Sequence, residues 1–318
     1  MRIQLNNLDL SSSSGPNCFG TCLARAFFEM GHEVVFDSNA DVSLVFIERT
    51  GEKLCDKVVH RLDGIWSSQK DFEQKNRNIK QTYVLADAVV FQSEFDKGVI
   101  TKLFGEPKQS VVIHNGTDAT PIREHKFTGL ERIRQEHDIV YSCSAMWHTQ
   151  KRLRENVELF KHLRSLSPDK KSCLIVLGTV DNQQNYDLLR ADTGIFYAGC
   201  QSLDVCLEVY AMSTYFIHSA WCDHCPNTVI HALSQETPVI CASSGGTKEI
   251  VKDFGIVLQE ENELEHGYFD WDLPPTLNVK QIKQLPDVKS LGSHVDVSIK
   301  NVAKKYVELF ESVIHSSM

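Results

Sequence analysis

Residues 219–251 read SAWCDHCPNTVIHALSQETPVICASSGGTKEIV, and they are the most informative part of the chain. The pattern predicts a strand that ends at Ser219, a short loop, and a helix that Pro226 opens. Proline fits the first turn of a helix, where its missing N–H costs nothing. A second strand then leads into a loop of small residues, SSGGTKE, which opens another helix. Strands and helices that alternate in this way are typical of an open parallel sheet.

The loops of this stretch are suited to binding an anion. The first N–H groups of the helix after Pro226, together with its dipole, form a ready anion site. Asp223 stands just before this helix, and His231, eight residues on, lies about two turns away on roughly the same side. Ligands of such sheets bind at the carboxyl ends of the strands. We therefore expect the functional site in these loops.

The same alternation extends outward through the chain. The first half is predicted to contain a helix that begins at Thr21 and strands at 2–5, 34–36, 42–48, 56–62, 87–93 and 110–116. A polar stretch at 119–136 indicates a linker, and strands at 138–145, 172–178, 194–199, 214–219 and 238–242 follow it. The pattern weakens from 256 to 295, and a clear amphipathic helix closes the chain. We predict an α/β fold with doubly wound, Rossmann-like domains at 1–120 and 137–296, joined by a linker at 121–136.

Composition restricts the class of protein. The 318 residues suffice for about two domains, and 42% hydrophobic with 24% charged residues is ordinary for a globular protein. The net charge of −9 argues against a duplex nucleic-acid partner, because proteins that bind duplexes usually carry a surplus of basic residues. We find no apolar run of 18 residues and no secretory signal. We therefore expect a cytoplasmic protein without a transmembrane segment, whose ten cysteines stay reduced.

The stretch at 219–251 resembles the signature of the retaining glycosyltransferases of family four, which have the two-domain GT-B fold. That family has an acidic residue, seven further residues and a Glu, followed by Gly-x-Pro-Val and Gly-Gly-x-x-Glu. The matching residues here are Asp223, Pro226, His231, Gly245, Gly246 and Glu249. The segments GTCLARAFFEMGHEV, ADAVVFQSEFDK, VIHNGTD and VYAMSTYFIHSAW also resemble family segments, in the expected order. The resemblance covers nearly the whole chain.

The resemblance implies two Rossmann-like domains that face a central cleft, and a C-terminal helix at 297–318 that packs back on the N-terminal domain. It implies a nucleotide-diphosphate sugar as donor and a hydroxyl acceptor, such as a glycan, a lipid-linked saccharide or a small molecule. The reaction that the resemblance implies requires no metal and no other cofactor, because a helix N-terminus and cationic side chains stabilise the leaving diphosphate. A donor phosphate oxygen is thought to take the acceptor proton in such enzymes.

The resemblance also assigns roles to donor-side residues. Asp223 bonds to sugar hydroxyls and Lys151 neutralises the diphosphate, while His231 replaces the Glu that binds the ribose. The family's Arg before Lys151 is missing, and Arg152 or Arg154 can substitute for it. The run that holds sugar and diphosphate through its backbone comprises His224, Cys225, Pro226, Asn227 and Thr228. Gly15 of the first loop and Glu249 complete the set.

On the acceptor side, the segment VVHRLDGIW ends a strand where the family often has a functional His. Either His60 or Asp63 is then expected to face the acceptor, and the sequence does not decide between them. Other functions stay open beside this one. They are a phage-type transferase for modified nucleic-acid bases, an inactive GT-B scaffold and a sugar-nucleotide epimerase. Cys222 and Cys225 have zinc-ligand spacing, but no second pair lies nearby in the sequence.

Overall fold

The computed structural model describes residues 1–12, 14–51, 53–124, 126–180, 182–261, 264, 267–292 and 295–316. The chain divides into two compact units. The first unit comprises Met1–Asp118, Glu265–Phe269 and Val297–Met318, and the second comprises Ala119–Leu264 and Asp270–Asp296. The first unit is thus assembled from both ends of the chain and from a short segment that interrupts the second unit in the sequence.

A parallel six-stranded sheet, counted over the described residues, forms the centre of the first unit, in the order β2-β1-β3-β4-β5-β6. Its strands are β1 (Arg2–Asn6), β2 (Glu33–Val35), β3 (Val42–Phe46), β4 (Val58–Leu62), β5 (Ala88–Phe91) and β6 (Ser110–Val112). The strand order reverses between β1 and β3, where Ile3 pairs with Val42. This is the flavodoxin-like form of a doubly wound sheet.

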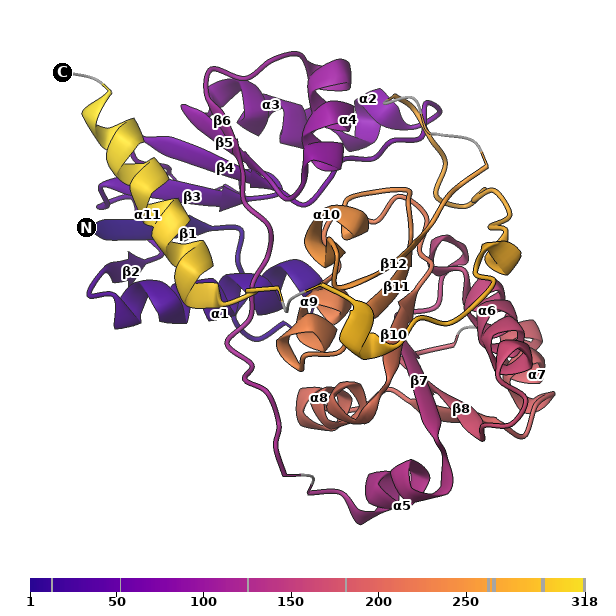
Figure 1. The fold of residues 1–318 in the computed structure, drawn as a ribbon. Helices are drawn as coiled ribbons and strands as arrows, with labels where there is room; N and C mark the ends of the chain where they lie inside the picture. Colours follow the sequence, from indigo (N-terminus) through magenta and orange to yellow (C-terminus); the bar gives the residue numbers. More distant parts are fainter. Residues whose placement is uncertain are drawn as a thin grey trace. The chain divides into compact units, whose positions relative to one another are not determined.

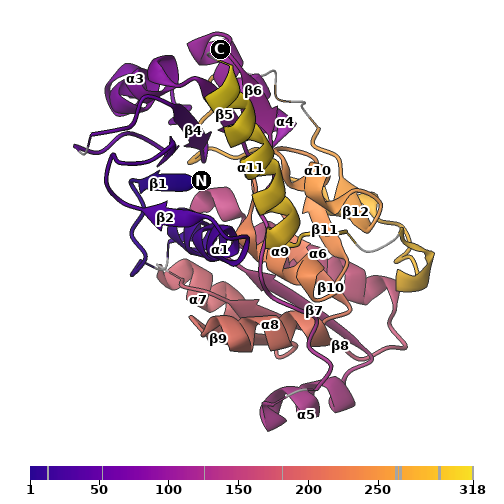
Figure 2. The ribbon, with the colours of Figure 1, turned by 90° about the vertical axis from the view of Figure 1, so that its left-hand side faces the viewer.

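The helices of this unit are α1 (Gly15–Glu29), α2 (Phe72–Lys75), α3 (Arg77–Leu85), α4 (Glu94–Phe104) and α11 (Ile299–His315). One face of the sheet is covered by α1 and α11, which meet through Phe27, Tyr306 and Phe310. Figure 1 and Figure 2 show α11, in yellow, beside the indigo elements of this unit. The helix α1 begins at Gly15, before the predicted Thr21, because Pro16 lies in its first turn.

The second unit has its own parallel sheet of six strands among the described residues, in the order β12-β11-β10-β7-β8-β9. Its strands are β7 (Ile139–Ser144), β8 (Ser172–Leu177), β9 (Ile195–Gly199), β10 (Tyr215–His218), β11 (Val239–Ala242) and β12 (Gly255–Leu258). Counted within the unit, this is the Rossmann order, and it reverses between β7 and β10. A ligand site is expected at the carboxyl ends of these two strands.

The helical elements of the second unit are α5 (Thr128–Glu136), η1 (Thr149–Lys151), α6 (Leu153–Leu166), α7 (Gln183–Arg190), α8 (Leu203–Met212), α9 (Asn227–Ser234), α10 (Thr247–Val251), η2 (Val279–Gln281) and η3 (Val288–Ser290). The core on one face of the sheet is filled from α6, with Val157 and Phe160 fully buried. On the other face α9 contacts β10 and β11.

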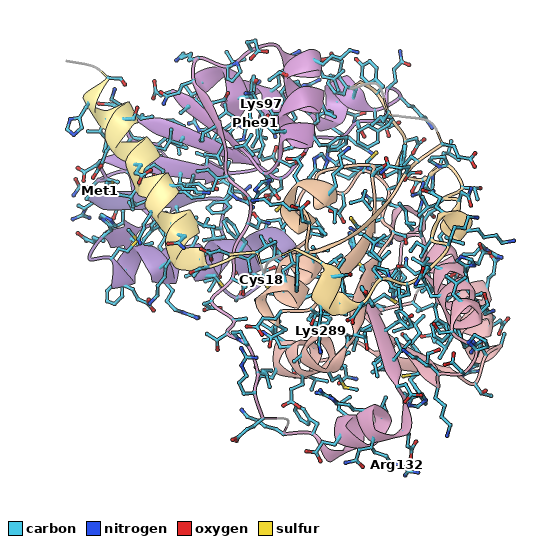
Figure 3. All side chains as sticks on the ribbon, viewed as in Figure 1. Met1, Cys18, Phe91, Lys97, Arg132 and Lys289 are labelled. Carbon is cyan, nitrogen blue, oxygen red and sulfur yellow. The ribbon has the colours of Figure 1, made fainter. Side chains whose placement is uncertain are left out.

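Two segments differ from the sequence prediction. The predicted linker contains α5, a polar helix from which Arg132 extends to pair with Glu136 at 2.7 Å (Figure 3). The chain before α5 is held by the buried carboxylate of Glu208, which accepts hydrogen bonds from the backbone N–H groups of Lys126 and Phe127. The region from 256 to 295 contains most of β12, whose four residues are too few to show a period.

Candidate functional site

The carboxyl ends of β7 and β10 bring together two residues that are 72 positions apart. Lys151 ends η1, in the loop after β7, and Asp223 lies in the loop after β10. The Nζ atom of Lys151 lies 2.5 Å from Oδ2 of Asp223. Both side chains are largely but not fully buried, with 23% and 13% exposed. Because the strand order reverses here, this ion pair lies where doubly wound sheets bind their ligands.

A third side chain bonds to the same carboxylate oxygen. His218, the last residue of β10, places Nε2 3.2 Å from Oδ2 of Asp223. Burial raises the pKa of Asp223, but the Lys151 ammonium and the His218 imidazole outweigh it, and the pKa lies well below its usual range. Burial lowers the pKa of His218, and the hydrogen bond to Asp223 opposes that shift. The carboxylate is therefore charged at neutral pH.

The backbone around Asp223 is held by the glycine loop after β11. Residues 223 and 245 form a parallel bridge, and the N–H of Gly246 donates to the Asp223 carbonyl at 2.8 Å. Gly245 has φ +85°, and a Cβ there would lie 2.4 Å from that carbonyl oxygen. Only glycine fits this approach. The predicted Gly-Gly pair thus fixes the position of Asp223.

The helix predicted after Asp223 is present, and it begins in the same loop, after the carboxyl end of β10. Pro226 is the N-cap of α9, which runs Asn227–Ser234. The first N–H groups of a helix have no acceptor within it, so this end of α9 can receive an anion. The side chains of Asn227, Thr228 and His231 are half-buried, and those of His224, Cys225 and Pro226 are buried. Glu249 lies half-buried on α10.

Arg152 adjoins Lys151 but has different surroundings. It adopts a left-handed conformation with φ 52°, which turns its side chain into the protein, where none of it is exposed. Its guanidinium forms a two-point ion pair with Glu260, at 2.7 and 3.2 Å, and donates to the carbonyls of Ser219 and Pro275. The indole of Trp221 lies 5.2 Å from this cation. Arg152 therefore links the loops around the site from within, whereas Arg154 on α6 is exposed.

The cysteines of the Cys-x2-Cys pair lie in the same loop. Cys222 and Cys225 are both buried and unbridged, and burial raises the pKa of the Cys222 thiol. Over the residues that the structure describes, no three His, Cys, Asp or Glu side chains group together as metal ligands.

The acceptor-side residues lie in the first unit. His60 is fully buried in β4, where its Nε2 donates to the carbonyl of Ile47 at 2.6 Å. Burial lowers the pKa of His60 to about 4, so this ring is neutral. Asp63 follows β4, is 14% exposed, and bonds to the side chains of Arg61 and Gln92. Gly15 is exposed at the start of α1.

Two residues around Lys151 and Asp223 are absent from the predicted donor set, His218 and Glu260. His218 lies five residues before Asp223, and this spacing carries no motif. Glu260 lies 108 residues from Arg152 in a polar stretch, so no local pattern could pair the two. Both are visible only through the packing of the strand ends.

Comparisons with known proteins agree with this architecture. Residues 136–266 match the family described as Glycosyl transferases group 1. Sucrose-phosphate synthase from Thermosynechococcus elongatus is 12% identical with a TM-score of 0.67, over 99% of this chain and 100% of that chain. HepE of Anabaena, solved with UDP and glucose, is 13% identical with a TM-score of 0.68, over 98% and 100% of the two chains. WaaG, a glycosyltransferase of lipopolysaccharide biosynthesis, is 13% identical with a TM-score of 0.62, over 99% and 98%.

The fold is thus that of the two-domain GT-B glycosyltransferases, which confirms the predicted α/β class. The predicted resemblance is confirmed at the level of glycosyl transferases group 1, whose sequence signature covers the loops of Lys151 and Asp223. No curated protein matches the sequence significantly. The described residues form no helix that is both long and apolar enough to span a membrane.

Proposed function

We propose that the protein is a cytoplasmic, retaining and metal-independent glycosyltransferase of family four. It moves a sugar from a nucleotide-diphosphate sugar to a hydroxyl of a glycan, a lipid-linked saccharide or a small molecule. The observation that carries this proposal is the ion pair of Lys151 and Asp223 before the N-terminus of α9, at the strand reversal. The group 1 match and the UDP-glucose complex of HepE support a nucleotide-sugar donor.

The geometry gives each group a task. When the glycosidic bond to the diphosphate breaks, negative charge grows on the leaving oxygen. Lys151 and the N–H groups of α9 stabilise that charge, because they are held in place before the reaction. The Asp223 carboxylate stays ionised and accepts hydrogen bonds from the sugar hydroxyls. A donor phosphate oxygen on the same face takes the acceptor proton, so the reaction needs no second carboxylate.

In the first unit, Asp63 is the better of the two acceptor-side candidates. His60 has its Nε2 committed to Ile47 and is fully buried, whereas Asp63 reaches the surface. We propose that Asp63 contacts the acceptor and that His60 supports the sheet.

The test is nucleotide binding by native protein and by Lys151→Met, measured as thermal stabilisation with UDP, GDP, ADP, CDP and their sugars, without metal. A ligand at 100 times its dissociation constant adds about 2.7 kcal/mol of stability, which is easily detected. We expect one nucleotide to stabilise the native protein and to bind Lys151→Met at least about tenfold more weakly, because a hydrogen bond to a charged group contributes about 1.5–3 kcal/mol.

Lys170→Met is the matched control. Lys170 is exposed in the turn before β8, at the amino end of that strand, whereas the site lies at the carboxyl ends of the strands. It should bind the nucleotide as the native protein does. If no nucleotide or nucleotide sugar stabilises the native protein, the transferase proposal is wrong and an inactive scaffold becomes the better explanation.

A further inference from the structure

One oxygen of the Asp223 carboxylate receives two hydrogen bonds from very different donors. Lys151 Nζ lies 2.5 Å from Oδ2 and His218 Nε2 lies 3.2 Å from the same atom. Lys151 is a flexible side chain with access to solvent, whereas His218 is 4% exposed within the sheet. Lys151 can therefore turn away from Asp223, and His218 cannot.

The proposed function requires Lys151 to turn away. Its ammonium cannot give the donor diphosphate its full charge while it is paired at 2.5 Å with a carboxylate. A largely buried carboxylate that loses the ammonium beside it is costly, because its hydration has already been given up. Something else must then compensate Asp223, and His218 already bonds to it.

The surroundings of His218 leave few other groups to respond. On its own strand, the ring of Phe216 stacks with that of His218, with centroids 6.4 Å apart. On β11 the neighbour in register is Cys241, whose pKa burial raises to about 12, so that its thiol is neutral. On α9, which contacts β10, the titratable side chain is His231. Tyr141 and Cys143 of β7 belong to the core on the opposite face.

We propose that His218 is a positioning residue that binds one proton from solvent when Lys151 leaves Asp223 for the donor diphosphate. The imidazolium then replaces the ammonium as the cation beside Asp223, and the carboxylate keeps its place for the donor sugar. This inference rests on the proposed function. No covalent bond changes in this step, and the proton returns to solvent when Lys151 pairs with Asp223 again.

The electrostatics support the direction of the proton transfer. In the structure, burial lowers the pKa of His218 and the Lys151 charge adds to that effect, while Asp223 raises the pKa. Departure of Lys151 removes a repulsive charge and leaves the attraction of Asp223 unopposed. The pKa of His218 must then rise, whatever anion attracted Lys151.

A first experiment needs no donor. The histidine rings are titrated by NMR in the native protein and in Lys151→Met, which keeps the apolar stem and removes the charge; His218→Gln assigns the signal. We expect the midpoint of His218 to rise by about one unit or more, a tenfold gain in proton affinity. The same midpoint in both proteins would overturn the proposal. Lys170→Met should leave the midpoint unchanged.

A second experiment tests the link to the donor. Nucleoside diphosphate binding is measured by calorimetry at pH 7 in two buffers of different ionisation enthalpy, which gives the number of protons taken up. We expect the native protein to take up more protons than His218→Gln, whose amide can still donate to Asp223 but cannot gain a proton. The protons that the nucleotide itself gains or loses are common to both proteins and cancel in this difference. A merely structural His218 would change affinity without changing proton uptake.

The two experiments separate the two proposals. If a nucleotide binds and the native protein takes up no more protons than His218→Gln, the role of His218 is wrong and the donor site stands. If the midpoint rises in Lys151→Met but no nucleotide binds, the electrostatic coupling between Lys151 and His218 stands, whereas its proposed trigger and the transferase function are wrong.

Discussion

The two units arrange the cations at the carboxyl edges of their sheets in different ways. In the first unit, the buried guanidinium of Arg61 bonds to Asp63 and, at 2.7 Å, to Asn115, and it lies over the ring of Phe19 at 4.3 Å. In the second unit, Arg152 is equally buried with Glu260, but Lys151 next to it retains access to solvent. Among the described residues, the first edge has the buried cation Arg61, and the second has the buried cation Arg152 next to the accessible Lys151.

The difference shows how an edge can be both rigid and responsive. A fully buried ion pair holds loops in place but offers no charge to a ligand. Lys151 can change partners because Arg152 holds the loops around it through Ser219, Pro275 and Glu260. We therefore expect substitutions of the buried cations to affect stability first, and substitutions of Lys151 to affect binding first.

The largest effect is expected at the Arg152–Glu260 pair. Arg152→Met leaves Glu260 buried without its counter-charge and should destabilise the protein by about 3–5 kcal/mol. The double variant Arg152→Met/Glu260→Leu replaces the pair with apolar groups of similar size and should recover most of that loss. Denaturant unfolding, followed by tryptophan fluorescence, measures both. A double variant as unstable as the single one would show that the charges themselves hold this edge.

A smaller, pH-dependent effect is expected at His60. Its folded pKa of about 4 lies below the unfolded value of 6.5. Between these values the unfolded chain binds more protons, so the stabilisation is complete above pH 6.5 and is lost as the pH falls towards 4. The full loss is about 3 kcal/mol.

His60→Gln keeps an N–H donor for the Ile47 carbonyl but does not titrate in this range. Its unfolding free energy should therefore fall less than that of the native protein between pH 7.5 and pH 4.5. Parallel curves for the two proteins would mean that His60 has the same pKa in the folded protein as in the unfolded chain.

The smallest effect is expected at Asn115. Asn115→Ala removes the 2.7 Å hydrogen bond to the buried Arg61 and should cost about 2 kcal/mol. Since this residue belongs to the first unit, nucleotide affinity should stay within about twofold of the native value. A large loss of nucleotide affinity in this variant would contradict the division of labour between the two edges.

Most of the fold follows from the sequence because parallel strands between helices are short, continuous apolar runs. The strand predicted at 172–178 is present as β8 (Ser172–Leu177), since five of its six residues are apolar and buried. The missed elements lack such a signal. All of the described side chains of α5 lie outside the core, and β12 has only four residues, three of them half-buried.

The candidate site was predictable in part for a similar reason. Asp223, Pro226 and the Gly-Gly pair occur in one continuous stretch, so their spacing can be recognised. The contacts that decide the use of each cation join positions far apart: Lys151 to Asp223, and Arg152 to Glu260. The sequence places two cations side by side without showing that a left-handed backbone at Arg152 turns only one of them inward.

The placement of α11 has a consequence for synthesis. This helix supplies Tyr306 and Phe310 to the core of the first unit, whose sheet ends at residue 112. The ribosome must complete the whole second unit before this helix exists, which takes roughly 10–35 s at typical bacterial to eukaryotic rates. Until then the apolar side chains of α1 and β1 that pack against α11 stay exposed to solvent. The described strands of the second unit end at residue 258, so its sheet can form while the first unit still lacks α11. The first unit, although it is synthesised first, is therefore the part of the nascent chain that needs protection from aggregation for the longest time.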